Sequence, residues 1–176
     1  MKNPVGCKRI SPVKVVFSAV ILLAAAAAVV CCCINIAKRD EVLIRERLHT
    51  LAGDLSKSDR ESTASALIKV KGIAGAFTNP MTMAMDNYAS GSYDHERLLA
   101  SAGRYRSMIA ASQVAASDIT VEMIGKDRAK VYFSGRFSGT LKNGMSDTII
   151  KDIEAELIKT DGRWLIGSMK FRNVLH

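Results

Sequence analysis

Hydrophobic and polar positions divide the chain of 176 residues into an apolar run near the N-terminus and a longer part with regular alternation. Residues 15–34 contain no charge, and Ser18 is their only hydroxyl side chain. The twenty residues of this run, at about 1.5 Å each, would form a helix of about 30 Å, which matches the hydrocarbon core of a bilayer. The run therefore predicts a membrane-spanning signal anchor, which we place at residues 15–37.

Two other interpretations of this run stay open. A cleaved signal peptide has an apolar region of roughly 7–15 residues. The alanines at 24–28 offer cleavage sites, but residues 29–34 would then remain as an apolar stub. A lipid anchor at Cys31 would need a small residue before the cysteine, where this chain has Val30. An uncleaved anchor fits the length and the flanks better than either alternative.

The charges on either side of the run predict its orientation. Four basic residues and no acidic residue precede it, namely Lys2, Lys8, Arg9 and Lys14. Behind it, at residues 38–41, two basic residues are followed by two acidic ones. Because basic residues near a membrane helix favour the cytoplasmic side, we expect residues 1–14 to form a cytoplasmic tail. The C-terminal domain then lies in the periplasm or outside the cell, as in a single-pass protein of a bacterial inner membrane.

Apolar residues return at helical spacing after the run. Intervals of 4, 3 and 4 separate Ile44, Leu48, Leu51 and Leu55. This spacing predicts an amphipathic juxtamembrane helix within residues 38–60, although the first helix of the domain could begin near residue 42. A second helix is expected from about residue 61 to residue 77, before Asn79-Pro80. A third follows Ser92 or Asp94, either of which can cap it, with a buried stripe of Leu98, Ala102, Tyr105 and Ile109.

Alternation with a period of two indicates strands in the rest of the chain. The methionines at positions 81, 83 and 85 predict a short strand, and Gly91 with Ser92 a turn after it. From Asp118 onward, the alternation predicts a meander of long strands that must bend, and we expect the bend at Gly135 and Gly139. The Asp-Gly pair at residues 161–162 predicts a tight hairpin before the last strand.

Three segments resemble the nuclear transport factor 2-like (cystatin-like, cone-shaped) fold: I-A-G-A-F-T-N-P, S-Y-D-H-E-R-L-L and I-K-T-D-G-R-W-L-I-G-S-M. The resemblance covers about residues 42–174 and implies an α+β domain at residues 61–176. About three helices would pack there on a curved, mostly antiparallel sheet. Because this fold carries enzymes, ligand binders and scaffolds alike, it implies no single function. The layout also resembles type IV secretion scaffold subunits and Mce-associated membrane proteins, but no motif assigns the chain to either.

Composition excludes several classes of function. The formal charge is +8, but residues from Lys38 onward hold 21 basic and 17 acidic residues, without a basic block of the kind that nucleic acid requires. The pair Arg104 and Arg106 is expected to lie on the solvated surface. All four cysteines lie at position 7 and in residues 31–33, so the domain has neither a disulfide framework nor a cysteine zinc site. We expect no metal and no cofactor.

Enzymes that the resemblance includes place an Asp or His base and a Tyr or acid donor inside the cone. The three histidines, His49, His95 and His176, are expected outside such a site, and we assign no catalytic residue. Eight residues are candidates to line the cone: Met83, Met85, Asp86, Tyr88, Tyr105, Phe133, Lys151 and Trp164. Each of these residues also fits an ordinary structural role, such as a core tyrosine in the case of Tyr105 or an edge lysine in the case of Lys151.

The sequence therefore favours a membrane-anchored, extracytoplasmic module of the cell envelope without enzymatic activity. Such a module would assemble through an envelope protein or through a second copy that pairs along the sheet. The alternative is a small-molecule binder, or a weak enzyme of the isomerase or cyclase type, that uses the cone. That alternative requires an open apolar cavity of roughly a few hundred Å³ with converging polar groups. A cone filled by Met83, Phe133, Trp164 and Tyr105 would exclude it.

Overall fold

Three helices and six strands make up the part of the chain that the computed structural model describes, residues 38–85 and 89–173. The first helix covers residues 38–55. The other elements are α2 (Thr63–Gly75), β1 (Phe77–Met85), β2 (Ala89–Tyr93), α3 (His95–Met108), β3 (Ile109–Met123), β4 (Arg128–Leu141), β5 (Ser146–Thr160) and β6 (Arg163–Asn173). Among these described helices, none is long and apolar enough to cross a membrane. The predicted anchor at residues 15–37 lies outside the described residues.

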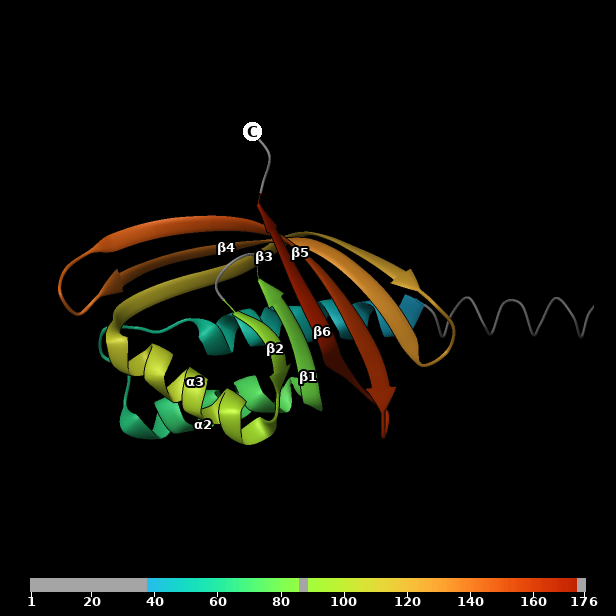
Figure 1. Cartoon of the computed structure of the whole chain (residues 1–176), viewed down its shortest axis with the longest axis horizontal. Coiled ribbons are helices and arrows are strands. Elements are labelled where there is room, and N and C mark those ends of the chain that lie inside the picture. The colour runs from blue at the N-terminus through green and yellow to red at the C-terminus, as the bar shows by residue number, and fades with distance from the viewer. Residues whose placement is uncertain (1–37, 86–88, 174–176) are drawn as a thin grey trace, which may run out of the picture. The chain divides into compact units, whose positions relative to one another are not determined.

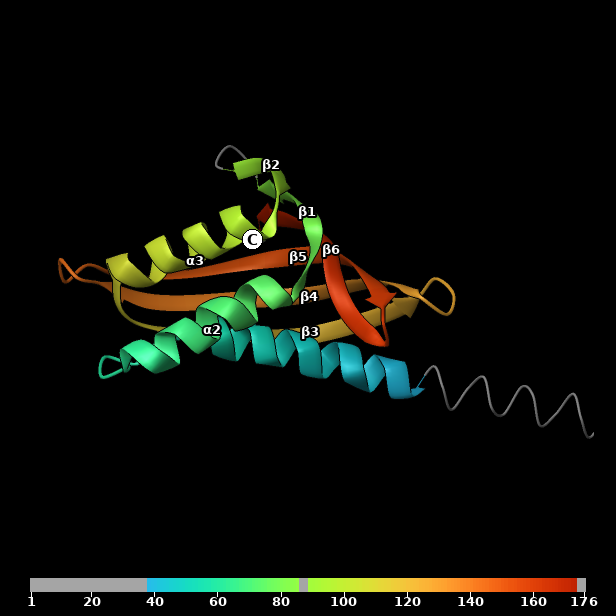
Figure 2. The same ribbon diagram turned by 90° about the horizontal axis from the view of Figure 1, so that it is seen from below.

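The six strands form one curved sheet with the order β2-β1-β6-β5-β4-β3. Neighbouring strands are antiparallel, except that β1 and β6 run parallel. The three helices lie on the concave side of the sheet, as Figures 1 and 2 show from two directions. This arrangement confirms the predicted α+β class, with three helices packed on a curved and mostly antiparallel sheet.

The first helix packs its apolar stripe into the core. Ile44, Leu48 and Leu51 are all buried, as their spacing predicted. At the start of the helix, the carboxylate of the buried Asp40 accepts hydrogen bonds from Lys159 Nζ at 2.7 Å and from Trp164 Nε1 at 3.2 Å. These two contacts join the beginning of the helix to the hairpin between β5 and β6.

β3 begins much earlier than the alternating pattern predicted. The pattern indicated a strand only from Asp118 and placed Ile109 on the preceding helix, whereas Ile109 is the first residue of β3. Residues 110–117 are mostly small or polar and show no clear alternation. They are extended because β4 supplies partners along this stretch, beginning with Ala111 opposite Thr140. Tertiary pairing therefore sets this strand boundary.

The segment predicted to turn at Gly91 and Ser92 is instead part of β2. In the antiparallel register with β1, Met83 lies opposite Gly91, and Thr82 lies opposite Ser92. The predicted hairpin at residues 161–162 is confirmed, and both of its residues have the positive φ angles that a two-residue turn of this kind requires.

Candidate functional site

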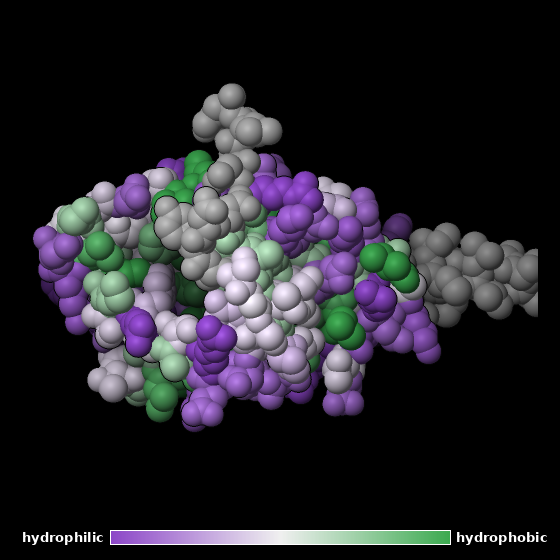
Figure 3. Space-filling model, viewed as in Figure 1, coloured by the Kyte–Doolittle hydropathy of each residue, from purple (hydrophilic) through white to green (hydrophobic). Residues whose placement is uncertain are grey.

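A cavity of about 1060 Å³ lies between the concave face of the sheet and the helices. The first helix, α2 and α3 line it on one side, and β1, β3, β4, β5 and β6 line it on the other. In the space-filling view, a hollow opens on the face of the molecule toward the viewer, and its floor is hydrophobic (Figure 3). The side chains of the described residues therefore leave the cone open.

The wall of this cavity is almost entirely apolar. Among the described residues that line it, only Ser101, Tyr105, Arg136 and Lys151 have polar side chains. No carboxylate and no imidazole belongs to that described lining. The chemistry that the wall offers is a large hydrophobic surface with two hydroxyl groups and two basic residues.

Tyr105 is a neutral and well-positioned part of the wall. Its hydroxyl lies 3.1 Å from the Leu55 carbonyl oxygen and 3.0 Å from Ser112 Oγ, so it can donate its one proton to either. Its ring packs edge-on against Phe137 at 6.1 Å between centroids. Burial raises the pKa of Tyr105 above its usual value of 10.0. The side chain therefore anchors α3 to β3 and presents a protonated phenol.

Lys151 places a cation on the cavity side of the sheet. It alternates with Ile149 and Ile153 on β5, and all three line the cavity. Its partner across the ladder is Gly135, which also lines the cavity and has no side chain to cover the lysine. A Cβ added at Gly135 would lie 2.7 Å from Ile153 Cδ1. The glycine thus keeps the wall open next to Lys151.

Arg136 on β4 also belongs to the lining, but its side chain lies on the opposite face of the sheet. It pairs with the exposed Ile150, one position along from Gly135 and Lys151. On this outer face, Ser134 donates a hydrogen bond to Asp152 across the same two strands. Because successive side chains point to opposite faces of a sheet, the guanidinium of Arg136 belongs to the outer face. Lys151 is therefore the charged side chain on the inner face of the described lining.

The structure places some of the eight candidate residues on the cavity wall and others elsewhere. The residues Met83, Met85, Tyr105, Phe133 and Lys151 line the cavity together. Trp164 does not line it; its side chain is buried, and its Nε1 donates a hydrogen bond to Asp40. Asp86 and Tyr88 lie outside the described residues.

The sequence did not indicate that Leu48, Leu51 and Leu55 of the first helix would form the floor of a cavity. Their spacing showed a buried stripe, but a stripe that faces a cavity has the same spacing.

The histidines lie away from the cavity wall where they are described. His95 begins α3, its Nε2 lies 3.3 Å from the Phe77 carbonyl oxygen, and its backbone N–H donates to Asn79. His49 is exposed on the first helix, and His176 lies outside the described residues. Within residues 38–85 and 89–173, no group of three or more His, Cys, Asp or Glu side chains is arranged to hold a metal ion.

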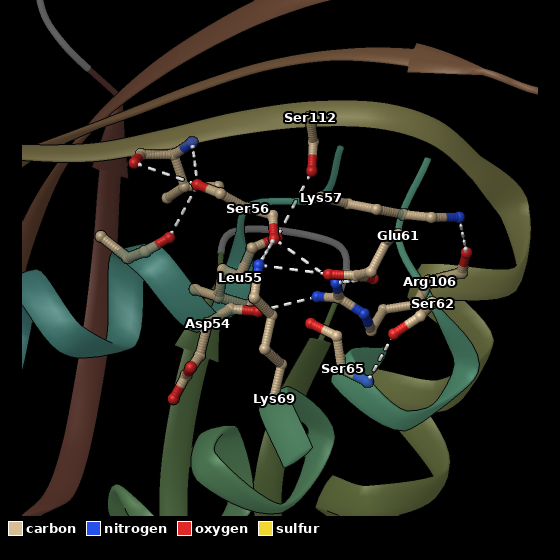
Figure 4. A network of polar contacts seen from close by, with 12 residues as sticks. Asp54, Leu55, Ser56, Lys57, Glu61, Ser62, Ser65, Lys69, Arg106 and Ser112 are labelled. Atoms are coloured by element: carbon tan, nitrogen blue, oxygen red, sulfur yellow. Dashed lines mark hydrogen bonds and ion pairs between the residues drawn. The ribbon is translucent and has the colours of Figure 1, made fainter. Parts of the chain in front are cut away.

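A network of buried charged side chains around Arg106, the residue after Tyr105, connects the three helices (Figure 4). Arg106 on α3 is 5% exposed and forms an ion pair with Glu61, whose side chain is 3% exposed. Glu61 also lies 3.1 Å from Lys69 Nζ on α2, and Arg106 Nη1 donates to the Asp54 carbonyl oxygen at 2.7 Å. The expectation that Arg106 lies on the solvated surface is therefore wrong, because Glu61 compensates its charge inside the protein.

The pKa values of the two acids in this network are shifted in opposite directions. For Glu61, burial acts against the charged form, but hydrogen bonds from Arg106 and Lys69 outweigh it and hold the pKa below the usual value of 4.5. For Asp54, burial dominates over nearby cations and raises the pKa above 3.8. The network joins the loop after the first helix to α2 and α3, and its role is to hold the helices around the cavity.

Comparison with known proteins establishes the fold but not an activity. Neither a protein-family model nor a curated protein sequence matches the chain. A Novosphingobium aromaticivorans protein with the provisional name scytalone dehydratase superposes with a TM-score of 0.68 at 9% identity, over 80% of this chain and 88% of its own. A Kribbella flavida protein named Kfla4162 gives 0.66 at 17% identity, over 79% and 93%. A hexachlorocyclohexane dehydrochlorinase gives 0.63 at 14% identity, over 78% and 86%.

Such low identities establish a shared fold and leave the chemistry undetermined. The order of elements, the curved mixed sheet and the superpositions agree with the resemblance found in three segments of the sequence. The described part of this chain therefore has the nuclear transport factor 2-like cone fold, with an open apolar cavity at its centre.

Proposed function

We propose that this protein binds a hydrophobic small molecule in its cone, and that it does so as a single-pass membrane protein with its domain outside the cytoplasm. The observation that carries the proposal is the apolar cavity of about 1060 Å³. Ligand pockets typically measure roughly 300–1,000 Å³ and are mostly apolar with a few polar groups. The cavity fits this description in its lining, and its volume is slightly above the upper end of the range. Attachment to the membrane rests on the apolar run at residues 15–34.

Water is a poor occupant for this cavity. At about 30 Å³ per molecule, the volume would hold about 35 waters, which would bond mainly to one another because the wall is almost entirely apolar. The wall offers four polar side chains, and that of Arg136 belongs to the outer face. A hydrophobic ligand would instead remove the wall from water, at about 25 cal/mol for each Å² of apolar surface buried. Binding such a ligand is therefore favoured.

The open cavity supports the small-molecule hypothesis over a module that acts only as a scaffold. Met83, Phe133 and Tyr105 form parts of the wall and leave the space free. A partner in the envelope stays a prediction, as does a second copy that pairs along the sheet. The exposed Tyr132 and Ile150 on the outer face are the residues such a pairing would use.

Catalysis of the isomerase or cyclase type is a second candidate function. The observation that favours it is the shared cone of two neighbours, one with the provisional name of a dehydratase and one named as a dehydrochlorinase. The wall of this chain offers the basic side chain of Lys151 and the hydroxyl of Tyr105, whose proton is already within hydrogen-bond distance of two acceptors in the protein. A bound molecule whose mass or structure changes during incubation with the purified protein would favour this candidate over simple binding.

Native mass spectrometry of the full-length chain tests the proposed function. The protein is purified from its own membranes into a detergent-free scaffold, and an unrelated single-pass protein in the same scaffold serves as the control. We expect one extra mass of roughly a few hundred daltons per chain, which disappears on denaturation and is recovered in an organic extract. A mass equal to the bare chain, with the same lipids as the control, would contradict the proposal.

A further inference from the structure

One end of the sheet is tied to the start of the first helix. Lys159 on β5 donates from its side chain to Asp40 at 2.7 Å and from its backbone N–H to the Asp127 carbonyl oxygen at 2.8 Å. Trp164 on β6 also donates to Asp40. The start of the helix, the turn between β3 and β4 and the hairpin between β5 and β6 thus lie at the same end of the sheet (Figures 1 and 2). We call this surface the proximal end; it comprises residues 40–43, 124–128 and 161–163.

Aliphatic side chains are exposed at the proximal end. Val42 and Leu43 on the first helix are 53% and 37% exposed, and Ile124, beside the turn between β3 and β4, is 56% exposed. Contact with the apolar boundary of a bilayer would remove these side chains from water. The proximal end therefore offers an apolar contact surface.

The charged side chains around this surface largely compensate one another. Glu41 pairs with Arg45 on the first helix, at 2.8 Å. Three basic and three acidic residues belong to the two turns and their flanks: Lys126, Arg128, Arg163, Asp127, Glu156 and Asp161. The first turn contains two of their ion pairs, each at 3.7 Å. Apolar contact, rather than attraction between opposite charges, is therefore the interaction that this end favours.

The sequence places a bilayer beside the proximal end. The predicted anchor ends at residue 37, and Val42 follows it by five positions. Docking of a surface so near its own anchor is intramolecular, so a small gain from a few aliphatic side chains is sufficient. A protein partner would have to compete with lipid that is already present at a high local concentration. The bilayer is therefore the occupant that fits this surface.

The cavity lies in the half of the cone farther from the proximal end. The nearer half of β4 and β5 is packed with residues that are at most 1% exposed and do not line the cavity: Ala129, Val131, Ala155 and Leu157. The lining on these strands lies beyond them and includes Ile149, which is 43% exposed near the turn between β4 and β5. Figure 3, in the view of Figure 1, shows the hollow away from the proximal end.

We propose that the proximal end rests on the surface of the bilayer, with Val42, Leu43 and Ile124 at the hydrocarbon boundary. The cone then opens toward the aqueous side, and its ligand enters from the side of the domain opposite the anchoring membrane. This inference rests on the membrane attachment in the proposed function. It goes beyond that function because it assigns the face of the domain that meets lipid and the direction of the cavity mouth.

Methyl NMR of the full-length chain in phosphatidylcholine nanodiscs tests this orientation. A small fraction of the lipid carries a gadolinium chelate on its headgroup, which enhances the relaxation of nearby methyl groups. Ile124 and Met145 are matched reporters, because both are exposed beside turns at opposite ends of β4. Since the 14 residues of β4 at about 3.3 Å each separate the two turns, we expect an enhancement at Ile124 at least about tenfold larger than at Met145.

Two double variants separate docking from simple proximity to the anchor. Val42→Ser with Leu43→Ser should reduce the enhancement at Ile124 several-fold, because the apolar contact is lost while the anchor remains. Leu67→Ser with Ile68→Ser makes the same change at an exposed aliphatic pair on α2, and it should leave the enhancement unchanged. The methyl shift of the buried Ile166 shows in each case that the domain is folded.

The possible outcomes separate this inference from the proposed function. An enhancement at Met145 equal to that at Ile124 would overturn the orientation and leave both the anchor and ligand binding intact. An enhancement at Ile124 that persists in the Val42 and Leu43 variant would overturn docking, because the tether alone would then explain it. A chain that does not enter nanodiscs would overturn membrane attachment and this inference together.

Discussion

At the scale of single residues, the ion pair between Arg106 and Glu61 should dominate the stability of the helical layer. Removing one partner of a buried pair leaves the other charge without compensation, which costs about 3–5 kcal/mol. Glu61→Gln should therefore lower the free energy of unfolding by about that amount in urea titrations. Trp164 is the only tryptophan and is buried, so its fluorescence is a suitable probe of unfolding.

The same variant should change the dependence of stability on pH. The folded-state pKa of Glu61 lies below 4.5, so its contribution is fully present above that pH and is lost as the pH falls through the lower folded value. In Glu61→Gln this acid-dependent loss should shrink. Asp54→Asn is the control, because the pKa of Asp54 is raised and its protonation favours the folded state. An acid-dependent loss that is unchanged in Glu61→Gln would contradict this assignment.

At the scale of elements, the attachment of the first helix to the last hairpin should depend on Asp40. Asp40→Ala removes the acceptor of Lys159 and Trp164 and leaves the indole N–H buried without this partner, which costs about 1–3 kcal/mol or more. We expect faster hydrogen exchange along residues 40–55 and a red shift of Trp164 emission. Glu46→Ala, on the exposed side of the same helix, should change neither. Unchanged exchange in Asp40→Ala would show that apolar packing alone holds the helix.

The elements also show how far the sequence could predict this structure. The spacing of Ile44, Leu48 and Leu51 predicted a helix because a periodic stripe reflects burial directly. The early part of β3, residues 109–117, was missed because its small and polar residues are extended only through pairing with β4. Arg106 on α3 was expected on the surface because its partner Glu61 lies 45 positions away in the sequence, in the loop before α2. Contacts of this kind depend on tertiary structure that no local pattern contains.

The cavity is a property of the whole molecule, since its size depends on how far three helices lie from the sheet. Phe133 and Tyr105 have the same local pattern whether they fill a core or line a space. The sequence therefore identified residues that face the interior, but only the structure shows that the interior is open.

Filling the cavity tests whether the open space serves ligand binding rather than stability. Ala116 lines the cavity from β3, and Ala116→Phe should stabilise the ligand-free protein by about 0.5–2 kcal/mol, as cavity-filling substitutions do. A ligand at 100 times its Kd stabilises the unmodified protein by about 2.7 kcal/mol, and this increment should be lost in the variant. Thr148→Phe adds the same ring on the outer face, where Thr148 pairs with Ser138, and should keep the increment. Thermal unfolding with and without ligand measures the stability increment for the unmodified protein and both variants. An increment that persists in Ala116→Phe would place the ligand outside the cone. A gain in the stability of the ligand-free variant would show that the natural chain retains an open cavity at the expense of stability.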